Sequence, residues 1–261
     1  MIKLFQIQSD GIDAEIPFVI STFPDKTSQV WKVGLDSKIP QSTAFKILWL
    51  FEREDELLHI VQLGQLLKTE TSQGVSLYAP YLPYARQDKE ISNHSTWALK
   101  MLADVLGLAQ FTQVSCFDQH SEKYFNSVKP FDFHKKVLNH DIVCFPDKGA
   151  LQRYSHLRTT PHVYFEKVRN QLTGQIESLS LNLNSQDLVG KSVVIVDDLC
   201  DGGGTFIQGI EYLQKHKPQY VDLCVSHGLF SQGREVLLEK GFRKILTTNS
   251  LLNNQYDYPV W

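Results

Sequence analysis

A strand that ends in two carboxylates and then turns through three glycines is the part of the sequence best suited to chemistry. The apolar run at 192–196 is followed by Asp197 and Asp198. The turn itself then reads Asp201, Gly202, Gly203, Gly204, Thr205. Glycines let several backbone N–H groups point into one small volume, and the start of a following helix adds partial positive charge. This turn therefore predicts a binding site for a phosphate monoester.

The two carboxylates need a different partner, because they would repel a phosphate that touched them. Asp197 and Asp198 could bind sugar hydroxyls or a divalent cation on the same ligand, which together with the phosphate describes a pentose phosphate. A flexible glycine turn after an exposed acidic pair is the alternative interpretation. The GxxxxGK[ST] spacing is absent, so the sequence does not support P-loop chemistry.

A second polar group follows the strand expected at 75–78. Arg86, Gln87 and Asp88 bring a cation, an amide and a carboxylate to the carboxyl end of that strand. The arginine fork donates two hydrogen bonds in one plane, which suits a polyphosphate. An exposed polar loop is the alternative for this stretch.

Short apolar runs alternate along the chain with segments of helical periodicity. Strands are expected at 17–21, 29–33, 46–51, 75–78, 111–116, 141–145, 162–165, 192–196, 221–226 and 244–248. Helices are expected at 55–68 and 98–107, from Gly149, at 206–216 and near 231–240, and a polar loop at 167–174. This alternation predicts parallel α/β sheets, arranged as two halves that meet near residue 140.

Composition narrows the class of protein. The chain has 261 residues, of which 42% are hydrophobic and 21% charged, so it can bury a core. The formal net charge of −3 gives no global electrostatic reason to expect nucleic acid or an anionic membrane as a partner. We identify no secretory signal or membrane span, and the four scattered cysteines lie in strand-like runs as small hydrophobes. These features predict a cytoplasmic protein.

Two motifs carry a family resemblance. Residues 193–206 resemble the signature of the type I phosphoribosyltransferase fold, which phosphoribosyltransferases share with PRPP synthases. The stretch YLPYARQDKE at 81–90 is nearly identical to the YxPYARQD motif of PRPP synthases, which transferases lack. The resemblance covers about residues 23–249 and implies an α/β fold of two phosphoribosyltransferase-like (Rossmann-like) domains with mainly parallel sheets. Residues 1–140 would form the ATP side and residues 141–261 the ribose 5-phosphate side.

The resemblance also implies roles for particular residues. Lys167 and Arg169 match the two essential cations of a mobile catalytic arm, and His120 and Asp147 match positions at the metal, which is Mg²⁺ in this family. The residues implied to bind ATP are Phe23, Asp25, Arg86, Gln87 and His120. The residues implied to bind ribose 5-phosphate are Asp197, Asp198, Asp201, Gly202, Gly203, Gly204 and Thr205.

Several positions depart from the family pattern. Lys148 and Ala150 stand in PDKGA where the family has PDxGG, and Val168 replaces the middle cation of the arm. Lys26 and Thr27 replace the Gly and Glu of the segment that holds adenine, so the resemblance leaves nucleotide selectivity open. The final residues LLNNQYDYPVW lack the helical tail usual in the family.

The activity implied by the resemblance is a Mg²⁺-dependent diphosphoryl transfer: ATP and ribose 5-phosphate give AMP and 5-phospho-α-D-ribose 1-diphosphate (PRPP). A phosphoribosyltransferase that consumes PRPP with a nucleobase is one alternative, and a non-catalytic regulatory relative is another. The family's adenine segment spans two subunits, so the resemblance implies a homo-oligomer, a dimer or higher. Neither nucleic acid nor membrane is expected as a partner.

Overall fold

The computed structural model describes residues 1–7, 13–32, 42–90, 95–169, 176–252 and 256–261. The chain divides into two compact units. The N-terminal unit comprises Met1–Lys129 with Ser250–Leu252 and Trp261, and the C-terminal unit comprises Pro130–Asn249 with Asn253–Val260. The chain therefore passes from one unit to the other ahead of residue 140, where the sequence analysis put the boundary.

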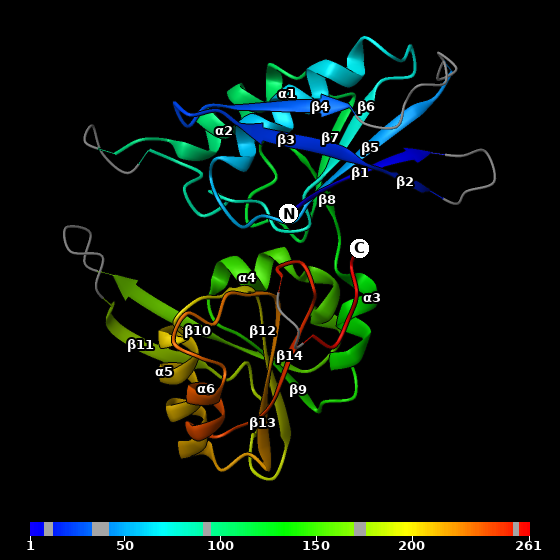
Figure 1. The fold of residues 1–261 in the computed structure, drawn as a ribbon. Helices are drawn as coiled ribbons and strands as arrows, with labels where there is room; N and C mark the ends of the chain where they lie inside the picture. The colour runs from blue at the N-terminus through cyan, green and yellow to red at the C-terminus, as the bar shows by residue number, and fades with distance from the viewer. Residues whose placement is uncertain (8–12, 33–41, 91–94, 170–175, 253–255) are drawn as a thin grey trace. The chain divides into compact units, whose positions relative to one another are not determined.

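A six-stranded sheet forms the centre of the N-terminal unit (Figure 1). Its order is β2-β1-β5-β6-β7-β8, in which β5 to β8 run parallel and β1 is antiparallel to β2 and β5. A separate antiparallel pair is formed by β3 and β4. The strands are β1 (Ile2–Ile7), β2 (Ala14–Ile16), β3 (Phe18–Thr22), β4 (Ser28–Lys32), β5 (Ala44–Trp49), β6 (Val75–Tyr78), β7 (Gln113–Phe117) and β8 (Asn126–Val128).

Two helices complete this unit, α1 (Glu56–Lys68) and α2 (Ala98–Gly107). α1 packs against α2 and against β4, β5 and β6. The apolar face expected for α1 is buried, including Leu57, Ile60 and Leu67, as the 3.6-residue period requires. These side chains join strand residues such as Phe45 and Leu77 in one core.

The C-terminal unit has its own six-stranded sheet, in the order β11-β10-β9-β12-β13-β14. All neighbours run parallel except β10 and β11, which form an antiparallel pair at one edge. The strands are β9 (Ile142–Phe145), β10 (His162–Arg169), β11 (Ile176–Asn182), β12 (Ser192–Cys200), β13 (Tyr220–Gly228) and β14 (Phe242–Thr247). β9, β12 and β13 are buried nearly throughout, which explains their continuous apolar sequences.

The helices of this unit are mostly short. They are α3 (Phe131–His134), α4 (Lys148–Arg153), α5 (Gly204–Leu213) and α6 (Glu235–Glu239), with 3-10 turns at Lys135–Val137, Ser155–Thr159 and Gln214–His216. α4 packs against β9, β10 and β12. Core residues such as Ile195, Phe206 and Leu223 lie between α5 and the sheet strands.

The two mainly parallel sheets confirm the predicted α/β fold. The polar loop predicted at 167–174 is wrong at its start, because β10 continues to Arg169 by pairing with β11. The four cysteines are free and buried, as predicted. Among the described helices, none combines the length and the apolar character that a bilayer span requires.

Candidate active site

The acidic pair at the end of β12 lies beside an arginine that the sequence analysis did not single out. Arg153, the last residue of α4, places Nη1 2.6 Å from Oδ1 of Asp198 and 3.6 Å from Oδ1 of Asp197. Asp198 is only 4% exposed, so this cation compensates a carboxylate that water hardly reaches. The pairing arises because β9, which leads into α4, lies next to β12 in the sheet. No local pattern in the sequence reveals that adjacency.

The charges of this group act on one another. Burial raises the pKa of Asp197 well above its usual value, and the negative charges of Asp198 and Asp147 raise it further, while Arg153 opposes them. Burial lowers the pKa of Arg153, but Asp198, Tyr154 and Asp197 outweigh this effect and keep that pKa above its usual value. Closely spaced carboxylates are thus only partly neutralised, and hydroxyl donors or a cation on a ligand would stabilise them.

The glycine turn after β12 leads directly into α5. Gly203 has a φ of +80°, in the left-handed region, and a Cβ there would approach Cδ2 of Leu237 to 2.7 Å. Only glycine therefore fits this position without strain. At Gly204, by contrast, an added Cβ would meet no described atom within 4 Å. The first residue of α5 thus borders open space, and the amino end of this helix favours an anion there.

Asp201 and Thr205 flank the glycines. Oγ of Ser231, in the segment after β13, donates a 2.6 Å hydrogen bond to Oδ1 of Asp201. This contact ties the turn to the neighbouring strand connection. The structure thus brings together, at the carboxyl ends of β9 and β12, every residue predicted to bind ribose 5-phosphate and the predicted metal residue Asp147.

Asp147 begins α4. Its Oδ1 accepts a 2.9 Å hydrogen bond from the backbone N–H of Ala150, which caps the helix. Ala150, which stands in place of the second family glycine, is 2% exposed and so packs as a small core residue. Its side chain is directed into the unit's interior, and the departure leaves the cap intact.

The predicted catalytic arm is the antiparallel pair β10–β11. Lys167 pairs with Leu179 and Arg169 with Ile176, and the register shifts between Val168 and Arg169. The backbone of both predicted catalytic residues is therefore part of a strand. The side chains of Lys167 and Arg169, together with residues 170–175, lie outside the described part of the chain.

An ion pair joins this arm to α4. Nζ of Lys148 lies 3.0 Å from Oε1 of Glu166, the residue that precedes Lys167. Glu166 also accepts hydrogen bonds from Tyr164 and Asn182 on the two strands; the pairing with Lys148 is the main cause that lowers its pKa. Lys148, at the variable position of the family motif, thus contacts the base of the arm.

In the N-terminal unit, Arg86 and Gln87 follow β6 and are exposed. The backbone N–H of Gln87 donates a 2.8 Å bond to the carbonyl of Tyr84, whose φ is +61°, and its carbonyl accepts from Leu99 at 3.2 Å. The main chain of this segment is therefore fixed, while both side chains face solvent. Such a loop presents a cation and an amide to a ligand, and its backbone loses little conformational entropy when the ligand binds.

His120 lies near the same segment. β6 and β7 are parallel neighbours, so the segments that follow them meet at one edge of the sheet. Burial tends to raise the pKa of Asp88, but hydrogen bonds from Lys123 and Ser121 and the nearby charge of His120 together lower it. His120 thus lies within electrostatic reach of Asp88, which follows Arg86 and Gln87 in the chain.

The predicted adenine residues Phe23 and Asp25 lie in the turn between β3 and β4. Phe23 is 42% exposed. Asp25 accepts hydrogen bonds from Thr27, at 2.7 Å from Oγ1 and 3.0 Å from the backbone N–H, and these bonds lower its pKa. Lys26 has a φ of +71°, which explains why glycine is favoured at this position.

A cavity of about 810 Å³ lies beside this β3–β4 pair in the N-terminal unit. It is bordered by residues from β3, β4 and the start of α1, among them Phe18, Thr27, Arg53 and His59. Neither Phe23 nor Asp25 lines it. Within the described residues, the predicted adenine contacts are therefore exposed on a turn rather than enclosed.

Comparisons with known proteins agree with this geometry. The Phosphoribosyl transferase domain family matches residues 142–256. A ribose-phosphate pyrophosphokinase of Sulfurisphaera tokodaii is 28% identical, over 96% of this chain and 93% of its own length. That of Pyrococcus furiosus is 27% identical, over 89% of this chain and 85% of its own.

A solved structure extends the match to three dimensions. The phosphoribosylpyrophosphate synthetase of Mycobacterium smegmatis superposes with a TM-score of 0.76, covering 95% of this chain and 87% of the other at 20% identity, which shows the shared fold. The chain is thus similar in sequence to ribose-phosphate pyrophosphokinases and shares the fold of a phosphoribosylpyrophosphate synthetase. In its N-terminal unit the family motif positions are Arg86, Gln87 and His120. In its C-terminal unit, Asp197 lies beside the Arg153–Asp198 pair and within electrostatic reach of Asp147.

Proposed function

We propose that this chain is a ribose-phosphate pyrophosphokinase, which converts ATP and ribose 5-phosphate into AMP and PRPP. The observation that carries the proposal is the near-full-length match to enzymes of that name, which includes the Arg86–Gln87 and His120 segments of the N-terminal unit. The segment from Asp197 to Thr205 would serve a phosphoribosyltransferase equally well, but Arg86, Gln87 and His120 would have no obvious role in one. The activity therefore accounts for both units.

The glycine turn would hold the 5-phosphate of the sugar. The N–H groups at the start of α5 and the hydroxyl of Thr205 donate hydrogen bonds, and the helix dipole favours negative charge at that point. Asp197 and Asp198 would accept hydrogen bonds from the two ribose hydroxyls. Asp198, the ion-pair partner of Arg153, accepts hydrogen bonds and so selects for hydroxyl donors.

The transfer itself needs positioning and charge stabilisation. The anomeric hydroxyl oxygen of the sugar attacks the β-phosphorus of ATP, forms the new O–P bond and loses its proton to solvent. The bond from the β-phosphorus to the oxygen that bridges it to the α-phosphorus breaks, and AMP leaves with that oxygen and the bonding electron pair. Arg86, Gln87 and His120 would orient ATP, with Phe23 and Asp25 at the base. Lys167 and Arg169 would stabilise the negative charge that develops on the transferred group, which is the main protein contribution in such reactions.

The residues present fit a requirement for Mg²⁺. Within the described residues, no cluster of three or more His, Cys, Asp or Glu side chains forms a ready cage for a metal. Mg²⁺ does not need one, because it binds through one or two carboxylates, with waters and substrate phosphates as the other ligands. Asp147 beside Asp197 would supply such carboxylates, with His120 on the ATP side. When bound, the ion neutralises phosphate charge and orients the oxygens.

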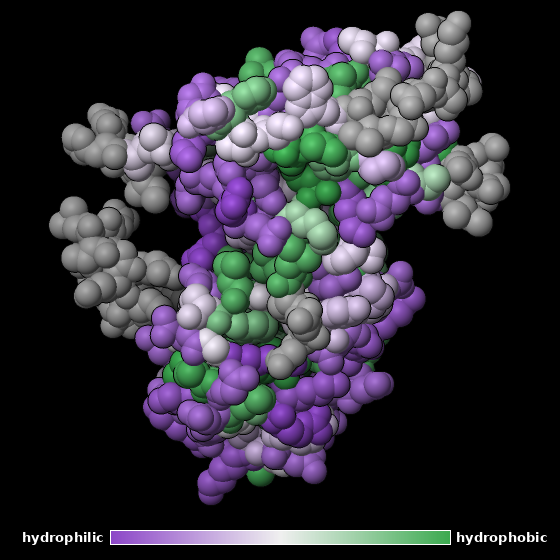
Figure 2. Space-filling view, viewed as in Figure 1, coloured by the Kyte–Doolittle hydropathy of each residue, from purple (hydrophilic) through white to green (hydrophobic). Residues whose placement is uncertain are grey.

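We further propose that the enzyme is a homo-oligomer, a dimer or higher, that works in the cytoplasm. Support comes from apolar side chains exposed on the β3–β4 pair, where Val19, Phe23 and Trp31 are 45%, 42% and 46% exposed. Figure 2 shows hydrophobic side chains gathered on the visible face over β1 and β3. Light scattering coupled to size exclusion tests the assembly, and a monomer would contradict it.

A direct assay tests the activity. Purified protein is mixed with Mg²⁺, ATP and ribose 5-phosphate, and AMP and PRPP are quantified together. Equal amounts of the two products support the proposal. PRPP consumption with a nucleobase, without that synthesis, would instead make the chain a phosphoribosyltransferase. Folded protein that shows no activity in either assay would indicate a non-catalytic regulatory relative.

A further inference from the structure

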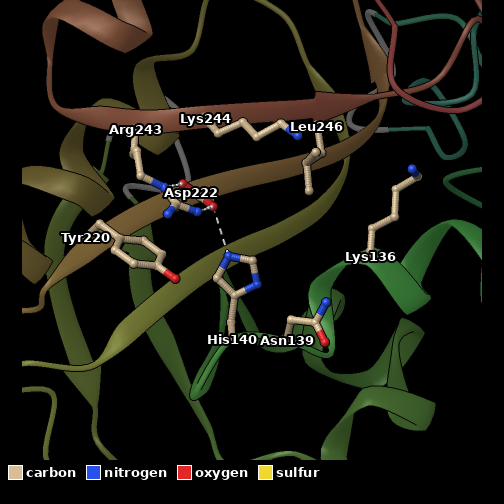
Figure 3. Close-up of a pocket in the computed structure, with 8 residues that line it drawn as sticks. All are labelled: Lys136, Asn139, His140, Tyr220, Asp222, Arg243, Lys244 and Leu246. Carbon is tan, nitrogen blue, oxygen red and sulfur yellow. Dashed lines mark hydrogen bonds and ion pairs between the residues drawn. The ribbon is translucent and has the colours of Figure 1, made fainter.

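A second cavity, of about 330 Å³, lies in the C-terminal unit (Figure 3). Its lining comes from the segment before β9, from the start of β13 and from β14. The lining side chains are Lys136, Asn139, His140, Tyr220, Asp222, Arg243, Lys244 and Leu246. Three permanent cations and one carboxylate therefore surround a space large enough for a small metabolite.

This cavity is at the opposite end of the sheet from the glycine turn. Asp222 pairs with Val194 near the start of β12, whereas Gly228 pairs with Cys200, which precedes the turn. The stretch of β13 between Asp222 and Gly228 spans about 20 Å. The cavity is thus separate from the predicted ribose 5-phosphate site.

The single carboxylate of the cavity is already compensated. Asp222 is 1% exposed and accepts hydrogen bonds from Nε2 of His140 at 2.9 Å and Nε of Arg243 at 3.0 Å, with Nη2 of Arg243 as a second donor. Burial tends to raise the pKa of Asp222, but the bonds from His140 and Arg243 outweigh it and lower that pKa. An anion entering the cavity would therefore meet little repulsion from this group.

The same contacts fix the guanidinium of Arg243 in one orientation at the cavity. Its guanidinium lies 3.5 Å from the ring centroid of Tyr220, and two of its N–H groups are fixed on Asp222. A guanidinium has five N–H donors, so donors remain beyond those on Asp222 and Tyr220, and the side chain is 51% exposed. An arginine immobilised in this way loses little conformational entropy when an anion binds.

Two lysines add charge from other elements. Lys136 contacts the ring of Tyr258 at 5.9 Å and makes no ion pair with a described carboxylate. Lys244 has one loose partner, Oδ1 of Asp257 at 3.6 Å, and is 55% exposed. The exposed amide of Asn139 also lines the cavity and supplies a further donor. Donors of this kind, around one compensated carboxylate, match a phosphate group.

We propose that this cavity is a second ligand site, which binds the phosphate group of a small anionic metabolite about 20 Å from the glycine turn along the strands. The rival explanation is that Asp222, His140 and Arg243 only tie the starts of β13, β14 and the segment before β9 together. That explanation accounts for the buried cluster. It gives no reason for Lys136 and Lys244 to face the same cavity.

Inorganic phosphate serves as the probe, added to ¹⁵N-labelled full-length protein at constant ionic strength maintained with chloride. We expect saturable shifts of the backbone amides of Asn139, Lys244 and Leu246, separate from those of Gly204 and Thr205. The double variant Lys136→Gln/Lys244→Gln should weaken the first response at least tenfold and leave the second unchanged. Lys135→Gln is the matched control, because Lys135 is adjacent to Lys136 but pairs with Asp132 and does not line the cavity.

Absent or non-saturating shifts around the cavity in wild-type protein would overturn the proposal. So would a double variant that binds phosphate there as well as the Lys135→Gln control does. The wild-type titration does not depend on the variants folding, and both lysines are exposed. The titration does not measure catalysis, so a failure of this proposal can be distinguished from a failure of the proposed synthase activity.

Discussion

Arg153 and Asp198 form a buried ion pair, with Nη1 and Oδ1 2.6 Å apart, between the end of α4 and the end of β12. α4 also begins at Asp147, whose charge raises the pKa of Asp197. One short helix thus carries both a carboxylate and the compensating cation of the acidic site. The placement of α4 against β12 therefore controls the charge available to a bound sugar.

Replacement of Arg153 by Met should destabilise the protein and weaken ribose 5-phosphate binding. It leaves Asp198 as a nearly inaccessible carboxylate without its cation, and breaking such a pair costs about 3 kcal/mol. Chemical denaturation measures the free energy of unfolding, and calorimetry measures the affinity for the sugar phosphate. Arg153→Met protein as stable as the wild type would contradict this account.

The matched control is Asp198→Asn, alone and combined with Arg153→Met. Asparagine removes the charge, so the double variant should lose less stability than the sum of the single losses, with a coupling free energy of about 1–3 kcal/mol. Asp198→Asn alone should also weaken ribose 5-phosphate binding. Additive losses would mean that Arg153 and Asp198 act independently.

The glycine turn offers a pair of substitutions with opposite expected effects. Gly203→Ala forces an L-residue to a φ of +80° and a Cβ to 2.7 Å from Leu237, so we expect a loss of about 2–4 kcal/mol in stability. Gly204→Ala meets no described atom within 4 Å and should keep the wild-type stability. Its methyl group would face the proposed phosphate, so the KM for ribose 5-phosphate should rise at least tenfold. An unchanged KM would mean that the phosphate of ribose 5-phosphate does not bind beside Gly204.

The sequence predicted the elements with strong periodicity best. β6 and α2 lie at the expected residues, because alternation of buried side chains and the stop at Gly107 are local signals. β1, β2, β8 and β11 were missed. β2 and β8 have only three residues each, and β1 and β11 exist because a neighbouring strand pairs with them.

In the candidate site, too, residues that are consecutive in the chain could be predicted, whereas contacts between distant segments could not. The residues from Asp197 to Thr205 could be recognised because they are consecutive, and strand, turn and helix follow directly in the structure. Arg153 could not, since it reaches Asp198 only through the order of strands in the sheet. Lys148 could be located at the variable position of the family motif, but its contact with Glu166 required the register of β10.

The arm cations should affect turnover far more than folding. Lys167→Ala and Arg169→Ala should each reduce kcat about 100- to 1,000-fold, which is the usual cost of losing a preorganised donor to a transition state. Steady-state assays measure kcat, and thermal unfolding checks the fold. The comparison variant is Lys148→Ala, which removes the ion pair at the base of the arm and should reduce kcat much less. Near-normal turnover of purified Lys167→Ala would exclude that residue from catalysis.

A buried histidine should make stability depend on pH. His134 is 1% exposed; its Nδ1 lies 3.0 Å from Nε2 of His156, and the two rings stack at an interplanar angle of 13°. Burial and the adjacent His156 lower the pKa of His134 to about 3. In the unfolded chain the group has its ordinary pKa of about 6.5, so the unfolded state binds more protons as the pH falls through that value. Stability is therefore expected to decline below about pH 6.5.

Between pH 7.5 and 5.5 this group should remove about 1.4 kcal/mol from the free energy of unfolding. His134→Phe keeps an aromatic ring beside Tyr154 and Phe133 but cannot titrate, so the variant should lose that much less over the same interval. Urea unfolding at the two pH values measures the difference, which cancels the contributions of the other histidines. His216→Phe, at a half-buried site where the ring stacks on Tyr212, is the control for the loss of a histidine elsewhere in the same unit. An equal pH dependence in His134→Phe and wild-type protein would show that His134 is protonated without cost in the folded state.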